Sequence, residues 1–495
     1  MKKFILFILC CALLFTGILT SCKSANNESV KTKNNNEENG AAESEDAENI
    51  DGNSDSDVVD RLSIPDNLPE ITFNNYNFRI YTAPAYADKN NAFVVQEEEI
   101  GEVINDAIYR ANQNVEERFD VTIRAVAIDN VESVMEKCVK SGDDAFDIGF
   151  GMDTAMGAGT LKGLYVNLYK VPNLDFSKPW WPKYTVDSLT FDGQMYMWSN
   201  SISILGMDWT RVLFINKGLT QELGLSLPYQ DVFNNTWTFD KMLDMCKNTY
   251  ADLNGNGEKD KNDRYGYACG GAFYCGIEPF GIEPLKKDGD TLTIDINNER
   301  TVKMVELMYE LIHGSPETYY NKSDFTQAID MFGDNRVLFL FGELGRARSK
   351  FRATEIDYGI LPYPMLDSEQ GQYYSGCTDR LFVIPETAKD LERTGTIVEA
   401  MSAEGYKRVA PAYNEIAMKN KYLSDDESSK ILDLVYDTRV LGFSFAYSIK
   451  FGNMLTHLLC DQATSDFASY YEKNIASVEK AVQNIENKFA AMKDN

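Results

Sequence analysis

Histidine is almost absent from this chain of 495 residues, since only His313 and His457 occur. Chemistry that needs a histidine pair with a third ligand or base is therefore mostly excluded. Cationic residues are also scarce, with 48 Lys and Arg against 76 Asp and Glu and a net charge of −28, so binding to nucleic acid is disfavoured. The sequence contains no C-x-x-C pair, G-x-S-x-G elbow, H-E-x-x-H motif or Walker A motif. A zinc knuckle and the corresponding enzyme classes thus have no support.

The amino terminus has the order of a bacterial export signal. Lys2 and Lys3 precede an apolar or small-residue run over 4–19, which is shorter than the roughly 20 residues that span a bilayer. The run ends in Leu-Thr-Ser-Cys at 19–22, which resembles the lipobox of bacterial lipoproteins. We therefore expect a signal peptide over 1–21 and a lipid-modified Cys22, with an uncleaved anchor helix as the alternative. Two or more acyl chains give stable membrane anchoring.

An acidic segment follows the predicted anchor. Residues 23–60 contain eleven acidic residues, three lysines and no aromatic residue, which predicts a disordered tether over 22–69. Because the rest of the chain is also strongly acidic, a neutral ligand fits better than an anionic one. Six cysteines remain beyond Cys22, too few for a disulfide framework; Cys269 and Cys275 are near enough to pair, with free buried thiols as the alternative.

Alternating strands and helices predict an α/β fold. Strands are expected at 78–81, 121–126 and 147–150, with helices over 104–119 and 131–139 between them. Further buried strands are expected at 211–216 and 336–341. A helix is expected to begin at Thr238, and another covers 298–313 with Val302 and Val305 on its apolar side. A last helix has an apolar face that consists of Phe467, Tyr471, Ile475, Val478, Val482, Ile485 and Phe489.

Residues 252–263 follow the spacing of a calcium-binding loop. Oxygen side chains occupy loop positions 1, 3, 5, 9 and 12, glycine occupies position 6, and a backbone carbonyl serves position 7. The expected ligands are Asp252, Asn254, Asn256, Glu258 through its carbonyl, Asp260 and Asp263. Position 12 is Asp rather than the usual Glu, as in dockerin-type loops, which the pattern resembles. The prediction is a weak, stabilising Ca²⁺ site and no organic cofactor, with a solvated Asn/Gly/Asp turn as the alternative.

Three later segments resemble the extracellular solute-binding proteins of carbohydrate ABC importers, the family of maltose-binding protein. These are FINKGL at 214–219, TWTFDKML at 236–243 and DRYGY at 263–267. Their order behind a lipobox makes the match specific, although the family's proline before Thr236 is absent. The resemblance implies a two-lobed, type II periplasmic-binding-protein-like α/β fold. Each lobe would be a mixed sheet flanked by helices, with a cleft and hinge between the lobes and no catalysis. The implied lobes are 70–207 with 376–420, and 208–375 with 421–495.

The ligand of such a protein would be a sugar or oligosaccharide, held by stacked aromatic rings and by polar groups on its hydroxyls. Loops at the carboxyl ends of parallel strands are expected to line the cleft. These loops and the crossing segments nominate Tyr86, Asp153, Asp208, Trp209, Glu343, Tyr374 and Asp379, and Trp181 is added as an aromatic candidate. Trp180 and Trp198 are further candidates, although tryptophans also fill cores.

The implied partners are a carbohydrate ligand, the permease subunits of an ABC transporter and, through Cys22, a lipid membrane. We expect a monomer that faces outside the cytoplasm, on the cell membrane or in the periplasm. Three alternatives remain: a glycosidase, which needs two carboxylates; a surface glycan-binding lipoprotein, which would be rich in helical repeats; and a binding protein that reports ligand to a sensor kinase. The sequence does not separate the last from import.

Overall fold

The computed structural model describes residues 60–87, 94–270, 276–377, 380–423 and 425–493. Cys22 and most of the predicted tether therefore lie outside the described residues, and so do Cys275 and Asp379. None of the helices within these ranges is long and apolar enough to cross a membrane.

The first sheet has four strands in the order β12-β3-β1-β2. They are β1 (Tyr76–Thr82), β2 (Val121–Ala127), β3 (Ile148–Met152) and β12 (Arg380–Val383). Both β2 and β3 pair parallel to β1, whereas β12, from much later in the chain, pairs antiparallel to β3. The predicted strands at 78–81, 121–126 and 147–150 are thus confirmed as the parallel part of a mixed sheet.

The second sheet has five strands in the order β10-β4-β9-β5-β8. They are β4 (Arg211–Asn216), β5 (Tyr265–Gly270), β8 (Thr318–Asn321), β9 (Val337–Glu343) and β10 (Tyr358–Leu361). All six residues of β4 and of β5 are buried, as expected for strands covered on both faces. The hydrophobic runs at 211–216 and 336–341 therefore predicted β4 and β9 correctly.

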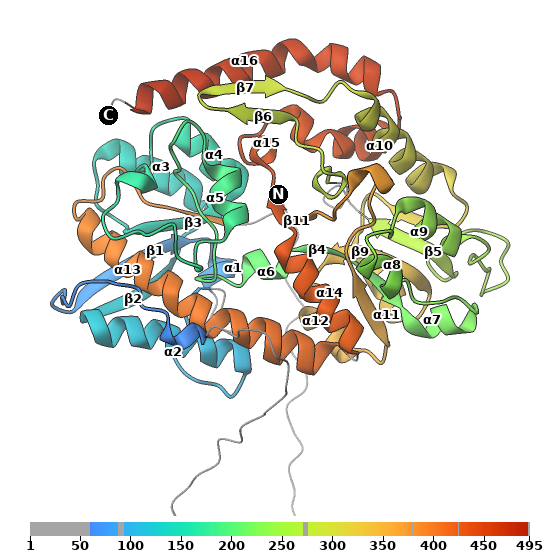
Figure 1. Cartoon of the computed structure of the whole chain (residues 1–495), viewed down its shortest axis with the longest axis horizontal. Helices are drawn as coiled ribbons and strands as arrows, with labels where there is room; N and C mark the ends of the chain where they lie inside the picture. The colour runs from blue at the N-terminus through green and yellow to red at the C-terminus, as the bar shows by residue number, and fades with distance from the viewer. Residues whose placement is uncertain (1–59, 88–93, 271–275, 378–379, 424, 494–495) are drawn as a thin grey trace, which may run out of the picture. The chain divides into compact units, whose positions relative to one another are not determined.

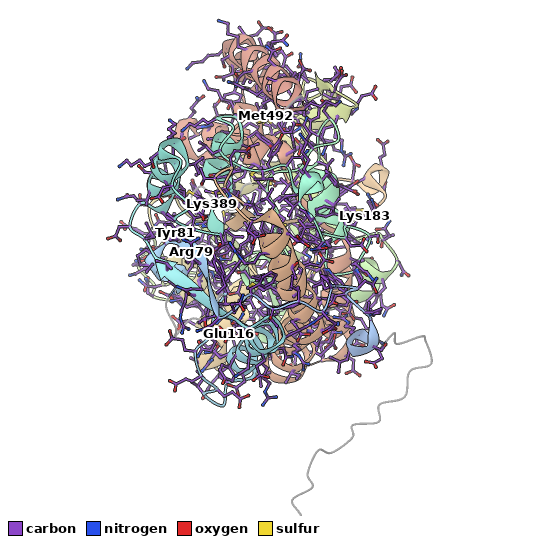
Figure 2. All side chains as sticks on the ribbon, turned by 90° about the vertical axis from the view of Figure 1, so that its left-hand side faces the viewer. Arg79, Tyr81, Glu116, Lys183, Lys389 and Met492 are labelled. Carbon is purple, nitrogen blue, oxygen red and sulfur yellow. The ribbon has the colours of Figure 1, made fainter. Side chains whose placement is uncertain are left out.

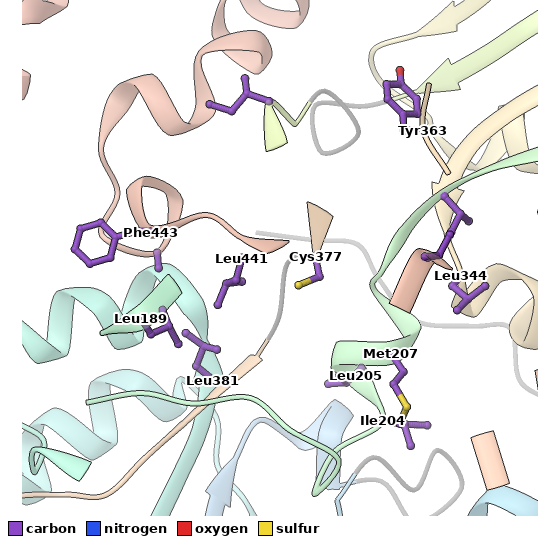
Figure 3. Close-up of a cluster of buried hydrophobic side chains, with 14 of the residues drawn as sticks. Leu189, Ile204, Leu205, Met207, Leu344, Tyr363, Cys377, Leu381, Leu441 and Phe443 are labelled. Atoms are coloured by element: carbon purple, nitrogen blue, oxygen red, sulfur yellow. The ribbon is translucent and has the colours of Figure 1, made fainter. Parts of the chain in front are cut away.

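Two short pairs complete the strands. In one, β11 (Ser375–Cys377) runs parallel to β13 (Arg439–Leu441); the other is a hairpin of β6 (Leu285–Asp288) and β7 (Thr291–Ile294). Thr210 bridges Cys377, so three distant segments run side by side near residues 210, 377 and 440. Figure 3 shows Leu205, Met207, Cys377 and Leu441 in the buried cluster that packs these segments together.

Helices surround the two larger sheets. The predicted helix before β2 is α2, which buries Ile104, Ile108, Val115 and Phe119 and packs beside α13 (Figure 1). It ends at Asp120 in the left-handed conformation.

Figure 2 shows Arg79 and Tyr81 of β1 above Glu116 of α2, whose carboxylate accepts the backbone N–H of Ile123 at 2.6 Å. The α-helices are α1 (Pro84–Ala87), α2 (Val103–Phe119), α3 (Val131–Ser141), α4 (Asp153–Thr160), α5 (Lys183–Leu189), α6 (Leu205–Asp208), α7 (Lys217–Glu222), α8 (Tyr229–Phe233), α9 (Phe239–Cys246), α10 (Glu299–Tyr309), α11 (Thr326–Gly333), α12 (Gly345–Ser349), α13 (Leu391–Glu404), α14 (Asp426–Asp437), α15 (Phe443–Ala446) and α16 (Phe467–Lys493).

Two helix predictions need correction. In α10 and its continuation η4 (Glu310–Gly314), Val302 is 38% exposed rather than on the apolar side, because Thr301, Met304 and Val305 take the buried face. In α16, Phe467, Val478, Val482, Ile485 and Phe489 are buried as predicted. The buried positions of its first turns, however, are Tyr470 and Asn474, whereas Tyr471 and Ile475 are only half-buried.

Candidate functional site

Residues from three parts of the chain meet at the carboxyl edge of the first sheet. Tyr86 follows β1 on α1, Asp153 follows β3, and Arg380 begins β12, where it pairs with Met152 of β3. The Arg380 Nε donates to the Tyr86 hydroxyl at 3.0 Å. The carboxyl ends of parallel strands are the usual position of ligand sites in α/β proteins.

The Arg380 guanidinium also joins this edge to the segment that crosses to the second sheet. Its central carbon lies 4.5 Å from the centre of the Trp209 ring and 5.4 Å from that of Tyr86. Trp209 and Tyr86 are both half-buried, so each ring keeps some surface open to solvent. The structure thus brings two of the predicted aromatic residues together around a cation that connects them.

Two predicted carboxylates lie next to this group, and each is paired with an arginine. Glu343 ends β9 opposite Arg211 of β4, and its Oε2 accepts from Arg346 Nε at 2.9 Å. Asp208 is buried, pairs with Arg348, and accepts the Tyr413 hydroxyl at 2.6 Å. Burial and the Asp208 carboxylate together hold the pKa of Tyr413 well above its usual value. Both carboxylates therefore have their charge balanced within the protein.

For the remaining predicted ligand residues, the hydrogen bonds and packing contacts that the structure describes are made with other residues. Trp181 is buried and its indole N–H donates to Glu399 at 2.9 Å. Tyr374 packs against Gly281, where a Cβ would meet its ring at 2.7 Å, a close approach that needs glycine at this positive φ. Asp153 is buried at the start of α4, and one of its oxygens accepts the Thr154 N–H at 2.8 Å. The structure therefore places Tyr86 and Trp209 around Arg380, and beside Trp209 in the chain it pairs Asp208 with Arg348, while Glu343 pairs with Arg346.

Two cations of this group were not among the predicted site residues. Arg380 and Arg346 carry no motif, and the sequence signal that could have found them is their position: Arg380 opens a strand and Arg346 follows one. Arg346 also lies 5.6 Å above the Phe325 ring. A planar guanidinium can stack on rings and donate several hydrogen bonds at once, which suits a ligand rich in hydroxyl groups.

The predicted calcium loop is compact and its polar side chains converge. The Asp260 carboxylate receives the side-chain amides of Asn254 at 3.1 Å and Asn256 at 3.0 Å. Asp252 accepts the N–H groups of Gly255 and Gly257, which lie at positive φ. Hydrogen bonds, first of all from the Asn262 N–H, lower the pKa of Asp260.

The last loop position fits calcium less well. Asp263 is buried, and its oxygens accept the N–H groups of Leu253 at 3.2 Å and Asp260 at 3.1 Å. Within the described ranges, no three His, Cys, Asp or Glu residues gather as a metal-binding group. The predicted calcium set depends instead on two asparagine amides and the Glu258 carbonyl beside its carboxylates, and it stays a prediction.

We expect millimolar Ca²⁺ to raise the melting temperature of the protein, because an ion that binds only the folded loop stabilises it by mass action. At a concentration one hundred times the dissociation constant the gain is about 2.7 kcal/mol. Differential scanning calorimetry with Ca²⁺ and with chelator measures it. Asp260→Asn should abolish the response, whereas an unchanged melting temperature of the parent protein would end the calcium prediction.

Cys269 on β5 is a free, buried thiol, and burial raises its pKa. The alternative of a free thiol therefore describes Cys269, whereas Cys275, its proposed disulfide partner, lies outside the described residues.

Comparison with known proteins tests the fold. No protein-family model matches the sequence, and no curated protein does either. Among solved structures, an ABC substrate-binding protein of Listeria monocytogenes in complex with cycloalternan matches with a TM-score of 0.51 and 14% identity. The match covers 86% of this chain and 100% of that one.

This chain has the fold of an ABC substrate-binding protein. UspC of Mycobacterium tuberculosis matches with the same TM-score of 0.51 at 13% identity, over 78% of this chain and 100% of its own. The maltose/maltodextrin-binding domain MalE of Bdellovibrio bacteriovorus, bound to maltotriose, matches at 15% identity with a TM-score of 0.49, over 85% and 100% of the two chains. The predicted two-lobed fold, with mixed sheets flanked by helices, is thus confirmed. The exact lobe boundaries stay a prediction.

Proposed function

We propose that this protein captures a sugar or oligosaccharide between its lobes and delivers it to an ABC permease. The first lobe is the part built on the four-stranded sheet, and the second is the part built on the five-stranded sheet. The observation that carries the proposal is the convergence of Tyr86, Trp209 and Arg380 where the chain crosses from one sheet to the other. The likeness in fold to a protein that binds cycloalternan supports it.

The chemistry of this cluster suits an uncharged polyol. The half-exposed rings of Trp209 and Tyr86 can stack on the C–H face of a sugar, and the Arg346 and Arg380 guanidinium groups can donate to its hydroxyls. Glu343 accepts a hydrogen bond from Arg346, and its remaining lone pairs can accept a hydrogen bond from a sugar hydroxyl. Because Asp208 and Glu343 are each paired with an arginine, we propose binding rather than the acid–base cleavage of a glycosidase.

Capture would proceed by rotation of the lobes about the segments near residues 210, 377 and 440. A ligand that contacts both lobes stabilises the closed arrangement by its differential affinity for that arrangement. The sequence supports a lipid anchor at Cys22 and a flexible tether, which would hold the binding unit at the outer face of the cell membrane or in the periplasm. We propose that it acts there as a monomer.

A thermal-shift screen of residues 60–495, the unit that contains every described helix and strand, tests this function. We expect neutral mono- or oligosaccharides to raise the melting temperature, whereas amino acids and peptides should not. Trp209→Ala should weaken the affinity for the best sugar by about 10- to 30-fold, since aromatic anchors dominate small-ligand and interface energetics.

The matched control is Tyr169→Ala, which removes an aromatic ring that is 43% exposed and lies outside the cluster. It should bind the sugar with the parent affinity. Stabilisation by peptides but by no carbohydrate would preserve the fold and overturn the proposed ligand class. Cleavage of an oligosaccharide during the incubation would instead favour the glycosidase alternative.

A further inference from the structure

The β6–β7 hairpin is rooted in the second lobe. The chain enters it from β5 and leaves it into α10, and both elements belong to the five-stranded sheet or its helices. Just before the hairpin, Phe280 stacks on Phe239 of α9 with ring centres 5.3 Å apart. The Phe280 carbonyl accepts from Arg300 Nη2 of α10 at 3.1 Å. These contacts fix the base of the hairpin to the second lobe.

The side chain of Lys287, near the end of β6, reaches the first lobe. Its ammonium donates to three carbonyls at the carboxyl end of α5, those of Asp187, Ser188 and Thr190. The Ser188 and Thr190 bonds measure 2.8 and 2.9 Å. The last carbonyls of a helix have no partner within the helix and carry its negative dipole charge, so the half-buried Lys287 ammonium is well suited to cap them.

The position of α5 shows that this contact is made with the first lobe. Trp181, just before α5, packs on Trp198 at 6.2 Å, and Trp198 stacks on Phe382 of β12 at 5.3 Å. Within α5, the Thr185 hydroxyl donates to the Ser199 carbonyl at 3.0 Å. The three hydrogen bonds of the Lys287 ammonium therefore end at the carboxyl end of α5, a helix that packs on β13 and is linked to the first sheet through Trp198 and Phe382.

A second element joins the two lobes beside the hairpin. The segment before α16 contacts the second lobe, where the Leu459 carbonyl binds His313 at 2.8 Å. At the other end of α16, Phe489 packs on Phe191 at 5.1 Å, and its carbonyl accepts from Gln194 at 3.0 Å. The helix also holds the hairpin, because Glu486 accepts the Leu292 N–H of β7 at 2.8 Å (Figure 1).

We propose that Lys287 is a positioning residue for ligand capture, which ties the hairpin of the second lobe to α5 of the first and so limits how far the lobes separate. The expected effect of the Lys287 contact on ligand affinity rests on the proposed function. Its expected effect on the separation of the lobes does not depend on any ligand. The hairpin and α16 form this connection beside the crossing segment near residue 440, because α5 also packs on β13 and Lys287 lies 5.1 Å from the Phe443 ring. A chain that lost the Lys287 contact would spend less time in the binding-competent arrangement, and its apparent affinity would fall accordingly.

The test is Lys287→Met, which keeps the length of the side chain and removes its charge and donors. Spin labels on cysteines introduced at Arg124 of β2 and Phe233 of α8, both exposed, report the distance between the lobes in a Cys138→Ser background. We expect a broader distance distribution for the unliganded variant than for the parent. We also expect a 3- to 10-fold weaker affinity for the sugar found in the screen.

The control is Lys286→Met, on the same hairpin. Lys286 is 71% exposed and pairs with Asp295 rather than with α5, so this variant should keep the parent distribution and affinity. Equal distance distributions for the parent and both variants would overturn the proposal. If no sugar bound any of the proteins, the proposed function would fail while the distance measurement still decided the role of Lys287.

The effect of pH on the distance between the lobes of the parent protein tests the role of Lys287 without a substitution at that residue. Burial lowers the pKa of Lys287 to about 8, although the Asp187 and Glu283 carboxylates that face it favour its charged form. The α15 element contributes the Phe443 ring, 5.1 Å from the ammonium, rather than a charge. Raising the pH from 7 to 9 should therefore broaden the parent distribution, and this change should be absent in Lys287→Met. A parent distribution that stayed constant over this range would contradict the proposal.

Discussion

Replacing Arg211 by Met should lower the free energy of unfolding by about 3–5 kcal/mol, because it leaves a buried carboxylate without its partner. Arg211 Nη1 donates to Glu278 Oε2 at 2.7 Å, and the two side chains are only 6% and 7% exposed. Glycines enclose the pair: a Cβ at Gly276 would lie 1.9 Å from Nη1, and one at Gly442 would lie 3.1 Å from the other Glu278 oxygen. The site thus has little room for water to replace the lost guanidinium. Urea unfolding monitored by circular dichroism measures the loss.

Two further variants distinguish the destabilisation caused by an unpaired buried charge from the contribution of the ion pair to the free energy of unfolding. The double variant Arg211→Met with Glu278→Leu should recover much of the lost stability, since apolar replacement of a buried ion pair is often close to neutral. Arg110→Met breaks the Arg110–Glu99 pair, whose side chains are 62% and 43% exposed, and should leave the free energy of unfolding close to that of the parent. Equal losses for Arg211→Met and Arg110→Met would contradict the assignment of Arg211 and Glu278 as a buried pair.

Arg211 shows which parts of the fold the sequence could predict. The run of apolar residues from 212 to 215 predicted β4 from hydrophobicity alone, and the same holds for β9 and for the apolar face of α2. Nothing in that pattern indicates that Arg211, the first residue of β4, is buried, because its partner Glu278 lies 67 positions away. Ion pairs between distant segments depend on the tertiary arrangement, which local periodicity does not encode.

The candidate site was also predictable only where its residues follow from the order of the strands. Because side chains after parallel strands gather at one edge of a sheet, Tyr86 could be nominated as a ligand residue; it lies beside Arg380 and Trp209, and its contact with a ligand stays a prediction. Trp209 could be nominated because it lies in the segment that was predicted to cross between the two lobes. Arg380 could not, since its role depends on the antiparallel pairing of β12 with β3, a strand more than 200 residues earlier in the chain. Trp181 was nominated for its aromatic character, but its environment is decided by Glu399, another distant residue.

Glu399 is a fully buried carboxylate, and among the residues that the structure describes its hydrogen-bond partners include no cation. It lies on α13 and accepts the indole N–H of Trp180 at 2.8 Å and that of Trp181 at 2.9 Å, together with the Asp175 N–H at 3.3 Å. Loss of solvation raises the pKa of Glu399 to about 7, and the three donors, which favour the charged form, only partly offset this effect. The charged carboxylate therefore costs free energy in the folded protein at neutral and higher pH.

Glu399 should make the folded protein less stable as the pH rises from about 4.5, its ordinary pKa, to about 7, because the folded state holds the proton longer than the unfolded state. Glu399→Gln removes this titration, although its amide would face the N–H groups of Trp181 and Asp175 and so lower stability at pH 5. Between pH 5 and pH 8 the stability of the variant relative to the parent should rise by about 2–3 kcal/mol. Urea unfolding at several pH values measures this difference, and Glu386→Gln, at a more exposed carboxyl group whose pKa is raised by partial loss of solvation, serves as a comparison without the indole partners. If the difference in unfolding free energy between Glu399→Gln and the parent did not change with pH, Glu399 would titrate normally in the folded protein. The hydrogen bonds from the two tryptophans would then offset the effect of burial on its pKa.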